Sequence, residues 1–297
     1  MIPSFFASFL RAKRSGGRRD ARECVRLYAE AGFRVIDYSP DFSDEGWLEE
    51  TYQAAEAAAK YGVDVTQCHA PFNFYKKEPL DKFRVLLDRA AEGARVLGAK
   101  QLVFHFDEYH PPAGVPFDAD TALRSAYEAL APAVEKTLAC GVGAAFENTF
   151  EDHHRVGPDE RSHLCAEIEE LEAAIGMFAD ERVSCCWDFG HAQLQFGDKH
   201  ADMIRRMGKR ISCTHVHDNY YGKDLHLMPF YGQLDWETLI PALADTGYAS
   251  SLVFEAGYGR FPDELTNEFL RMSMHALNIL CSYSQTRFST ATQIDKE

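Results

Sequence analysis

The chain has 297 residues, of which 46% are hydrophobic and 26% are charged, a composition typical of a soluble globular protein. Asp and Glu number 46 against 31 Lys and Arg, and the net charge of -15 argues against indiscriminate binding to nucleic acid or anionic membranes. No apolar run approaches the roughly 20 residues of a membrane span, and the N-terminus is apolar and then basic, the reverse of a signal peptide. We therefore expect no membrane partner.

Eight short apolar runs alternate with amphipathic stretches along the chain. The predicted strands cover 2–9, 33–38, 63–69, 101–106, 142–147, 183–188, 211–217 and 251–255. The predicted helices cover 21–31, 47–61, 80–97, 119–140, 161–178, 201–207, 236–244 and 263–282. Four of these helices are followed by a glycine, the residue that most readily takes the left-handed conformation at a helix end: Gly32, Gly62, Gly98 and Gly141.

This alternation predicts the fold class. Short, continuously apolar strands separated by amphipathic helices indicate a parallel sheet that is covered on its outer face. Eight such units without a Ser/Gly-rich linker favour a single-domain (β/α)₈ TIM barrel over 1–282 rather than two doubly wound domains. The polar, aperiodic segment 283–297 is predicted to be a tail outside the barrel.

The cysteines indicate a reducing environment. Eight cysteines in a chain of this length are too few for a disulfide scaffold, and they lie within apolar strand or helix patterns. We therefore predict reduced core thiols and a cytoplasmic location. Cys185 and Cys186 are adjacent in a predicted strand, so their side chains should point to opposite faces and serve packing rather than catalysis.

Residues that can carry chemistry follow six of the predicted strands. Active sites of (β/α)₈ barrels lie at the C-terminal ends of the strands, and the strand ends here carry His69, His105, Glu147, Asp188, His191, His215, His217, Asp224, His226 and Glu255. Their nitrogen and oxygen donors are ligands of divalent metals. Carboxylates that face one another at short range repel unless a cation lies between them. The sequence thus predicts a metal site at this rim.

The strand ends also carry the motifs of a known superfamily. The most specific are Glu147-Asn148-Thr149, Asp188-x-x-His191 and His215-x-x-Asp218, together with Glu255 after a Gly247-Tyr248 turn. Over roughly residues 2–280 the chain resembles the xylose-isomerase-like barrel superfamily, which holds sugar isomerases and epimerases, inosose-processing enzymes and endonuclease IV. The resemblance implies a barrel enzyme, and by analogy a homodimer or homotetramer.

In the epimerases of this superfamily a single divalent ion has four protein ligands, and the resemblance implies that these are Glu147, Asp188, His215 and Glu255. Three carboxylates and one imidazole suit Mn²⁺ or Zn²⁺, and Mg²⁺ or Co²⁺ would also fit. His215 is the preferred ligand because Asp218 then follows three residues later, as in the family pattern. His217 remains the alternative.

A second interpretation follows from endonuclease IV, which binds two further metals. Its additional ligand positions are all occupied here, by His69, His105, His191, Asp224 and His226. One further site would use His69 and His105 with a bridging Glu147, and the other would use the remaining three residues. Such a multi-zinc cluster would support hydrolysis of a phosphodiester in abasic DNA. In sugar isomerases the same histidines can instead contact substrate hydroxyls, so both roles stay open.

The substrate is less clearly indicated. The ketose 3-epimerases of the superfamily have a substrate-binding Glu where this chain has His153 and an Arg where it has Tyr221. We therefore expect a different polyol, ketose or keto-glycoside. The candidate substrate-binding residues are His217, Phe72 and Asn148. Phe72 with Phe74 and Tyr75 would form either an aromatic wall for a sugar ring or wedges in a DNA duplex.

A basic segment, 11–19, follows the first strand and carries five cations on an otherwise acidic protein. Its place on the rim would suit an anion clamp for a sugar phosphate, a uronate or a DNA backbone, and the alternative is a solvated loop. Five further histidines are predicted to lie at the surface rather than to bind metal: His110, His153, His154, His163 and His200.

These residues together favour a divalent-metal-dependent sugar isomerase or epimerase. By resemblance, Glu147 and Glu255 would remove and return a proton next to a carbonyl held by the metal, while Asp188 and His215 would hold the ion. The alternative is an endonuclease IV-like multi-zinc phosphodiesterase. The expected partner is a small carbohydrate, and nucleic acid is a partner only under the alternative.

Overall fold

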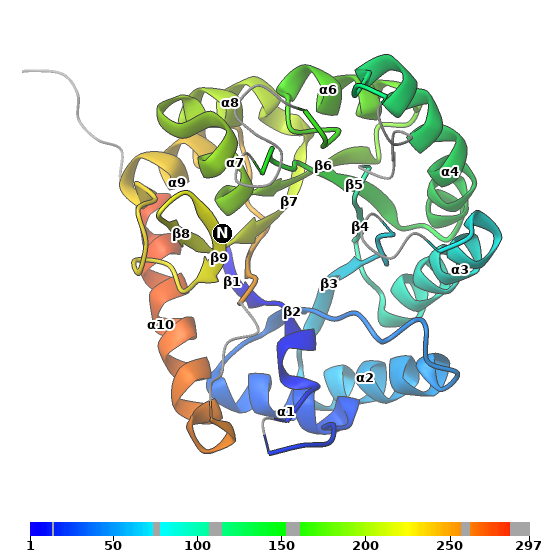
Figure 1. The fold of residues 1–297 in the computed structure, drawn as a ribbon. Helices are drawn as coiled ribbons and strands as arrows, with labels where there is room; N and C mark the ends of the chain where they lie inside the picture. The colour runs from blue at the N-terminus through cyan, green and yellow to red at the C-terminus, as the bar shows by residue number, and fades with distance from the viewer. Residues whose placement is uncertain (14, 74–77, 107–114, 153–160, 257–261, 286–297) are drawn as a thin grey trace, which may run out of the picture.

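The computed structural model describes residues 1–13, 15–73, 78–106, 115–152, 161–256 and 262–285. Eight parallel strands form one sheet, and a parallel bridge between Phe6 and Asp37 brings its two edges together, so that the sheet closes into a barrel (Figure 1). In spatial order the strands are β1 (Ile2–Phe5), β10 (Ser251–Phe254), β7 (Ile211–Val216), β6 (Val183–Asp188), β5 (Gly143–Glu147), β4 (Gln101–Phe104), β3 (Asp64–His69) and β2 (Val35–Asp37). The predicted (β/α)₈ TIM barrel is confirmed.

Helices surround the strands on the outside of the barrel (Figure 1). They are α1 (Ala21–Ala31), α2 (Trp47–Tyr61), α3 (Leu80–Leu97), α4 (Ala119–Ala139), α6 (Ile168–Gly176), α8 (His200–Met207), α9 (Trp236–Asp245) and α10 (Thr266–Tyr283). Asp20, Asp118 and Asp235 accept backbone N–H bonds as N-caps of α1, α4 and α9. Gly32, Gly62 and Gly98 close their helices in the left-handed conformation, as predicted. Among the described helices, none has the length and apolar character needed to cross a membrane.

The core has two parts. Large side chains such as Phe5, Tyr28 and Trp187 fill the layer between sheet and helices, whereas a small cluster of Val103, Ala145, Cys186 and Cys213 fills the inside of the barrel. Cys185 packs in the outer layer and Cys186 in the inner one, which confirms that the two side chains point to opposite faces. All eight cysteines are free thiols. Burial raises the pKa of the Cys185 and Cys186 thiols well above its ordinary value.

Several element boundaries differ from the prediction. The first strand ends at Phe5, and Ala7–Leu10 form a 3₁₀ turn. The predicted helix 161–178 is shortened to α6, because Glu151 accepts the backbone N–H groups of Ser162 and His163 and holds that segment in a loop. The closing helix starts at Thr266, after a 3₁₀ turn over Asp263–Leu265, and ends at Tyr283. The predicted tail 283–297 lies mostly outside the described residues.

Two elements of the upper rim were not predicted. Helix α7 (Phe189–Phe196) begins directly after β6, with Asp188 as its N-cap. A hairpin of β8 (Asp218–Tyr220) and β9 (Lys223–Leu227) follows β7, and its turn residues Tyr221 and Gly222 both have positive φ. Such a turn normally selects Asn or Gly at its first position, so a tyrosine conceals it in the sequence.

Asp218 anchors the end of this hairpin. Its carboxylate accepts hydrogen bonds from the backbone N–H groups of Phe230 and Leu234 and from Nε1 of Trp236. Gly232 packs so closely against Asp218 that a Cβ there would collide with the carboxylate. The Asp218 of the His215-x-x-Asp218 motif therefore fixes the course of the chain that carries Asp224 and His226.

Candidate metal centre

Four carboxylate and imidazole groups converge above the barrel interior. They are Glu147 at the end of β5, Asp188 at the end of β6, His215 on β7 and Glu255 directly after β10, and their candidate ligand atoms all lie within 4.8 Å of one another. Nδ1 of His215 lies 3.2 Å from Glu147 Oε1, 3.5 Å from Glu255 Oε2 and 3.8 Å from Asp188 Oδ2. We call this group the first cluster. It brings together the four residues that the resemblance implies as metal ligands.

His215 and His217 play different parts in this arrangement. Nδ1 of His215 faces three carboxylates, whereas Nε2 of His217 donates a hydrogen bond of 3.1 Å to Asp188 Oδ2. The other oxygen of Asp188 accepts the N-capping hydrogen bond from the backbone N–H of His191. Within the first cluster, His215 therefore has the position of a ligand and His217 that of a support for a ligand.

The charges in the first cluster are strongly coupled. Burial alone would raise the pKa of Glu147, but His215 and His105 outweigh it and lower that pKa well below its ordinary value. Burial alone would lower the pKa of His215, but the carboxylates of Glu147 and Glu255 raise it well above the ordinary value. The carboxylates around His215 thus favour a positive charge at this position. A divalent cation can replace that proton, since metal ligands must be deprotonated.

The donor atoms fit a metal ion. Both ring nitrogens of His215 are buried without a hydrogen-bond partner, although polar atoms in protein interiors are nearly always paired. A set of three carboxylates and one imidazole in this position is typical of Mn²⁺, Co²⁺ or Mg²⁺, and Zn²⁺ would also accept it.

Two more histidines border Glu147. His69 Nε2 and His105 Nε2 lie 3.2 Å and 3.3 Å from Glu147 Oε2, and the Nδ1 of His69 lies 2.7 Å from the carbonyl oxygen of Ala70. Phe72 stacks on the His105 ring at a centroid distance of 4.7 Å. Burial lowers the pKa of His105, which favours the neutral ring that either a metal or a substrate hydroxyl requires.

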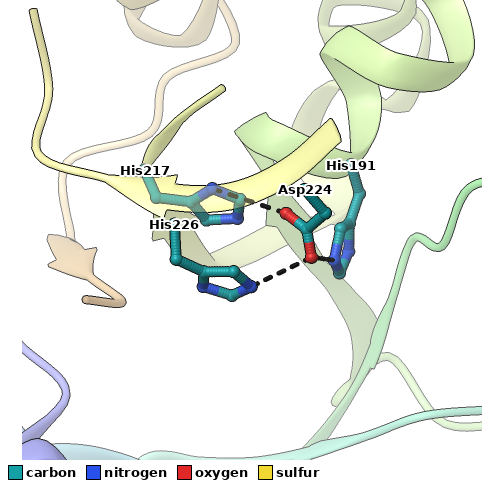
Figure 2. Close-up of side chains that lie close together, drawn as sticks. All are labelled: His191, His217, Asp224 and His226. Atoms are coloured by element: carbon teal, nitrogen blue, oxygen red, sulfur yellow. Dashed lines mark hydrogen bonds and ion pairs between the residues drawn. The ribbon is translucent and has the colours of Figure 1, made fainter. Parts of the chain in front are cut away.

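A second group of donors, partly carried by the β8–β9 hairpin, is shown in Figure 2. It consists of His191 on α7, His217 after β7, and Asp224 and His226 on β9, again with all candidate ligand atoms within 4.8 Å. Asp224 Oδ2 lies 3.1 Å from His226 Nε2 and 3.7 Å from His191 Nε2. We call it the second cluster. The three residues predicted as a further metal or substrate site are thus brought together, with His217 as an addition.

A cavity of about 750 Å³ opens above both clusters, a size in the usual range for small-molecule sites. Five cluster residues line it, namely Glu147, Glu255, His191, Asp224 and His226, and His69 and His105 line it beside them. Apolar side chains, among them Phe42, Phe72 and Phe150, form much of the remaining wall. Asp188 and His215 are completely buried, so the two glutamates reach the cavity while the aspartate and the histidine do not.

Two of the residues predicted to bind substrate, Asn148 and His217, are not among those that line the cavity. Asn148 is buried, and its side-chain amide bonds the backbone N–H and carbonyl of Asp188 at 2.7 Å and 3.0 Å. It therefore positions Asp188. His217 is also completely buried. Phe72 lines the cavity, whereas Phe74 and Tyr75 lie outside the described residues.

The basic segment after the first strand is largely neutralised. Arg11 and Arg18 pair with Glu50, Lys13 pairs with Glu23, and Arg19 pairs with Asp263. Arg14 lies outside the described residues, and of the other four cations Arg11 lines the cavity. These pairs leave the described part of the segment poorly suited to gripping a long polyanion.

Some residues near the rim lie elsewhere than the sequence predicted, and one was not predicted at all. The prediction of a surface position for His200 is wrong, because its ring is buried and Nε2 accepts a hydrogen bond from Trp187 Nε1. His163 lines the cavity instead of the open surface, and His110, His153 and His154 lie outside the described residues. Asp37 was not singled out, although it ends β2 and burial raises its pKa to about 7. The strand-end rule applied to β2 would have found it.

The fold and the clusters define a barrel with a candidate metal centre, and a comparison with known sequences names its family. The chain belongs to the xylose isomerase-like TIM barrel family, whose model matches residues 25–273. The chain is 25% identical over 288 residues to an uncharacterised protein of Sinorhizobium fredii, covering 87% of this chain and 88% of that one. It is 24% identical over 270 residues to the rhizopine catabolism protein MocC of Rhizobium meliloti, covering 81% and 76% respectively.

Solved structures share the fold at low identity. A xylose isomerase domain protein from Alicyclobacillus acidocaldarius superposes with a TM-score of 0.74 at 16% identity, over 96% of this chain and 100% of that one. A 3-keto-D-glucoside 4-epimerase from E. coli gives 0.69 at 17% identity, over 94% and 100%. An AP endonuclease of family 2 from Brucella melitensis gives 0.67 at 17% identity, over 92% and 98%.

Proposed function

We propose that the protein is a divalent-metal-dependent isomerase or epimerase of a sugar or sugar derivative. The observation that carries this proposal is the pair of glutamates at the floor of the cavity. Glu147 and Glu255 lie on either side of Nδ1 of His215, at 3.2 Å and 3.5 Å, and both line the cavity. Two carboxylates at one site are the arrangement needed to remove a proton and return it elsewhere.

The roles divide according to exposure. Glu147, Asp188, His215 and Glu255 would hold the cation, which when bound polarises a carbonyl and acidifies the adjacent C–H. The carboxylates of Glu147 and Glu255 remove and return the proton, because they are the members of this set that reach the cavity. His69 and His105 are within reach of substrate hydroxyls at the same wall, and Phe72 offers an apolar face to a sugar ring. Cytoplasmic location and homo-oligomerisation belong to the proposal as well.

The proposed substrate is a small polyol, ketose or keto-glycoside. The solved epimerase of a 3-keto-D-glucoside shares this fold, and the MocC relative is named for the catabolism of a rhizopine. A single sugar ring needs only part of a 750 Å³ cavity, which also accommodates a substituent. This size supports a sugar derivative at least as well as a free ketohexose.

The alternative function is a multi-zinc phosphodiesterase acting on abasic DNA. One observation favours it, namely that His69, His105 and Glu147 form a compact triad of possible ligands. The described cations of the basic segment are paired with carboxylates and the chain has a net charge of -15, whereas a DNA-binding surface needs unpaired Lys and Arg. We therefore rank this function second.

The test is proton exchange with solvent, using the metal-loaded protein and a panel of ketoses, inososes and 3-keto-glycosides in D₂O. We expect deuterium in the product or the recovered substrate. Glu255→Gln should lower turnover by about 10²–10⁴-fold, the usual contribution of a general acid or base. Glu268→Gln, an exposed position on α10, is the matched control and should turn over normally. Near-normal turnover by Glu255→Gln would refute the assignment.

A further inference from the structure

The inside of the barrel below the first cluster has an apolar half and a polar half. The apolar half consists of one residue from each of the neighbouring strands β4 to β7: Val103, Ala145, Cys186 and Cys213. On the other side, β1, β2 and β3 contribute Ser4, Asp37 and Gln67, each at most 1% exposed. Ser4 Oγ, Asp37 Oδ2 and both polar atoms of the Gln67 amide have no hydrogen-bond partner among the described residues. Since buried polar atoms are nearly always paired, this half of the interior has unused capacity to bind.

Strand geometry places the polar half directly beneath the cavity. Successive side chains of a strand point to opposite faces, so residues two apart share a face. Phe6 and His69 line the cavity, and Ser4 and Gln67 precede them by two residues. Both therefore point into the barrel, one layer below the cavity. Asp37 pairs with Gln67 in the register of β2 and β3 and bridges to Phe6, so it belongs to the same part of the interior. It does not itself line the cavity.

His215 extends from β7 toward this polar half. Its ring stacks on that of His69 at a centroid distance of 5.7 Å. The backbone N–H of His69 donates to Ser39 Oγ at 2.7 Å, and this hydroxyl lies 3.5 Å from Asp37 Oδ1. Burial raises the pKa of Asp37 to about 7, and of the surrounding charges that of His215 lowers this pKa most. His215 is therefore the charged neighbour to which Asp37 responds most strongly.

The outer nitrogen of His215 needs an acceptor. Nδ1 faces the three carboxylates of the first cluster, so Nε2 lies on the other side of the ring. An imidazole that binds a metal through one nitrogen carries its proton on the other, where a carboxylate, a carbonyl or water usually accepts it. Nε2 of His215 is buried and has no partner among the described residues. Two buried carboxylate oxygens are likewise unpaired, Asp37 Oδ2 and Asp224 Oδ1, and the second lies beside His217 at 3.9 Å. This leaves Asp37 for His215.

We propose that Asp37 is a positioning residue for the metal of the first cluster, and that its carboxylate accepts the Nε2–H of His215 through a buried water that Gln67 also holds. The two side chains make no direct hydrogen bond, and a water molecule can satisfy both while it bonds to the Gln67 amide. Asp37 is completely buried, so it acts on the metal through His215 and does not touch the substrate. This inference rests on metal binding by the first cluster, which is part of the proposed function.

The first test titrates metal-free, full-length protein with Mn²⁺ and follows the EPR signal of the free ion. Asp37→Asn should weaken binding about 10–100-fold, the usual cost of losing an outer support, because a neutral amide is a poorer acceptor than a carboxylate. Asp37→Glu should restore most of the affinity, since its longer side chain brings a carboxylate into the place of the water. Asp64→Asn, exposed at the opposite end of β3, is the matched control and should bind like the wild type.

The outcomes separate this inference from the proposed function. Wild-type affinity in Asp37→Asn would overturn the role of Asp37 while the metal site stands. A wild type that binds no Mn²⁺ would refute the metal site and the role of Asp37 together.

The second test distinguishes positioning from a merely structural role. Burying a carboxylate without a direct partner costs free energy, so metal-free Asp37→Asn should be at least as stable to urea as the wild type. In the Mg²⁺-loaded protein, the Nε2–H proton of His215 should move upfield by NMR in Asp37→Asn, because its hydrogen bond is weaker. An unmoved proton, or a loss of urea stability that matches the loss of Mn²⁺ affinity, would overturn the proposal.

Discussion

The two clusters differ in donor chemistry and in how the chain builds them. The first cluster has three carboxylates and one imidazole, all placed by the ends of barrel strands, and it forms the floor of the cavity. The second has three imidazoles and one carboxylate, and half of its residues lie on the β8–β9 hairpin. Oxygen-rich sites favour Mn²⁺ or Mg²⁺, whereas nitrogen-rich tetrahedral sites favour Zn²⁺. The same rim thus carries one oxygen-rich and one nitrogen-rich group of possible metal ligands.

The difference also shows how the clusters are coupled. His217 bonds Asp188 of the first cluster through Nε2 and turns Nδ1 toward Asp224 of the second. Asn148 supports both clusters in a similar way, since its amide holds the backbone of Asp188 and its carbonyl faces His191. A disturbance at this junction should therefore reach the ligands of both clusters, whereas a change in the hairpin should reach those of the second cluster alone.

The largest effect is expected from a substitution of Gly190, which packs against His217 at the junction between the two clusters. The Cβ of Gly190→Ala would overlap the His217 ring, which is held on its other face by His226. We expect the ring to be displaced and the affinity of the first cluster for its proposed metal to fall about 10–100-fold, the usual cost of losing an outer support. Competition titrations with a chromophoric chelator would measure this affinity. The exposed Gly176→Ala, which meets no atom, is the control. An unchanged affinity would show that His217 does not support Asp188 as a ligand.

The next largest expected effect is a pH dependence of stability that comes from the buried His200, below the rim. Burial lowers its pKa to about 3, so the folded protein keeps the ring neutral while the unfolded chain takes up a proton below about pH 6.5. The contribution of the neutral His200 ring to the free energy of unfolding is complete above pH 6.5, and it is lost as the pH falls toward 3. At pH 5.5, protonation of His200 in the unfolded chain should lower the free energy of unfolding of the wild type by about 1.4 kcal/mol relative to neutral pH.

The corresponding variant is His200→Gln, whose amide oxygen can still accept from Trp187 Nε1. Urea unfolding at pH 7.5 and 5.5 should show a smaller loss of stability in the variant than in the wild type. The metal-site histidines titrate in both proteins alike, so their contribution cancels in the difference. Equal losses would show that His200 is not held neutral.

The smallest effect concerns the hairpin turn. Tyr221 has φ of 57° and is 76% exposed, so its side chain gains little packing for an unfavourable backbone conformation. Tyr221→Asn should raise the free energy of unfolding by about 0.5–1 kcal/mol, because Asn tolerates the left-handed region. Tyr231→Asn, also exposed but with ordinary φ, should bring no gain in a thermal melt. Stabilisation by both variants would indicate a solubility effect instead.

Much of the fold and of the first cluster could be predicted because each depends on local patterns. The barrel follows from alternating apolar runs, and Glu147, Asp188 and Glu255 each end such a run, so the strand-end rule places them on one rim. His215 was preferred to His217 only through the family pattern, because both lie at the end of β7 and the direction of each ring decides which carboxylates it meets.

The rest of the rim escaped prediction because it depends on distant contacts. The segment 161–167 has a helical pattern, but Glu151 and Glu170 accept its N–H groups and hold it in a loop. The hairpin is concealed by a tyrosine in a left-handed turn, and its position is fixed by Asp218, whose partners lie up to 18 residues away. The role of Asn148 as a support for Asp188 likewise rests on a pairing across 40 residues.

The most direct measurement is the metal content of freshly purified, unchelated protein by elemental mass spectrometry. The account predicts one Mn, Co or Mg per chain, which is lost from Glu255→Gln. Three zincs per chain would mean that His69, His105 and Glu147 also bind metal, and would move the phosphodiesterase function to the front. Well-folded protein without stoichiometric metal would contradict the account.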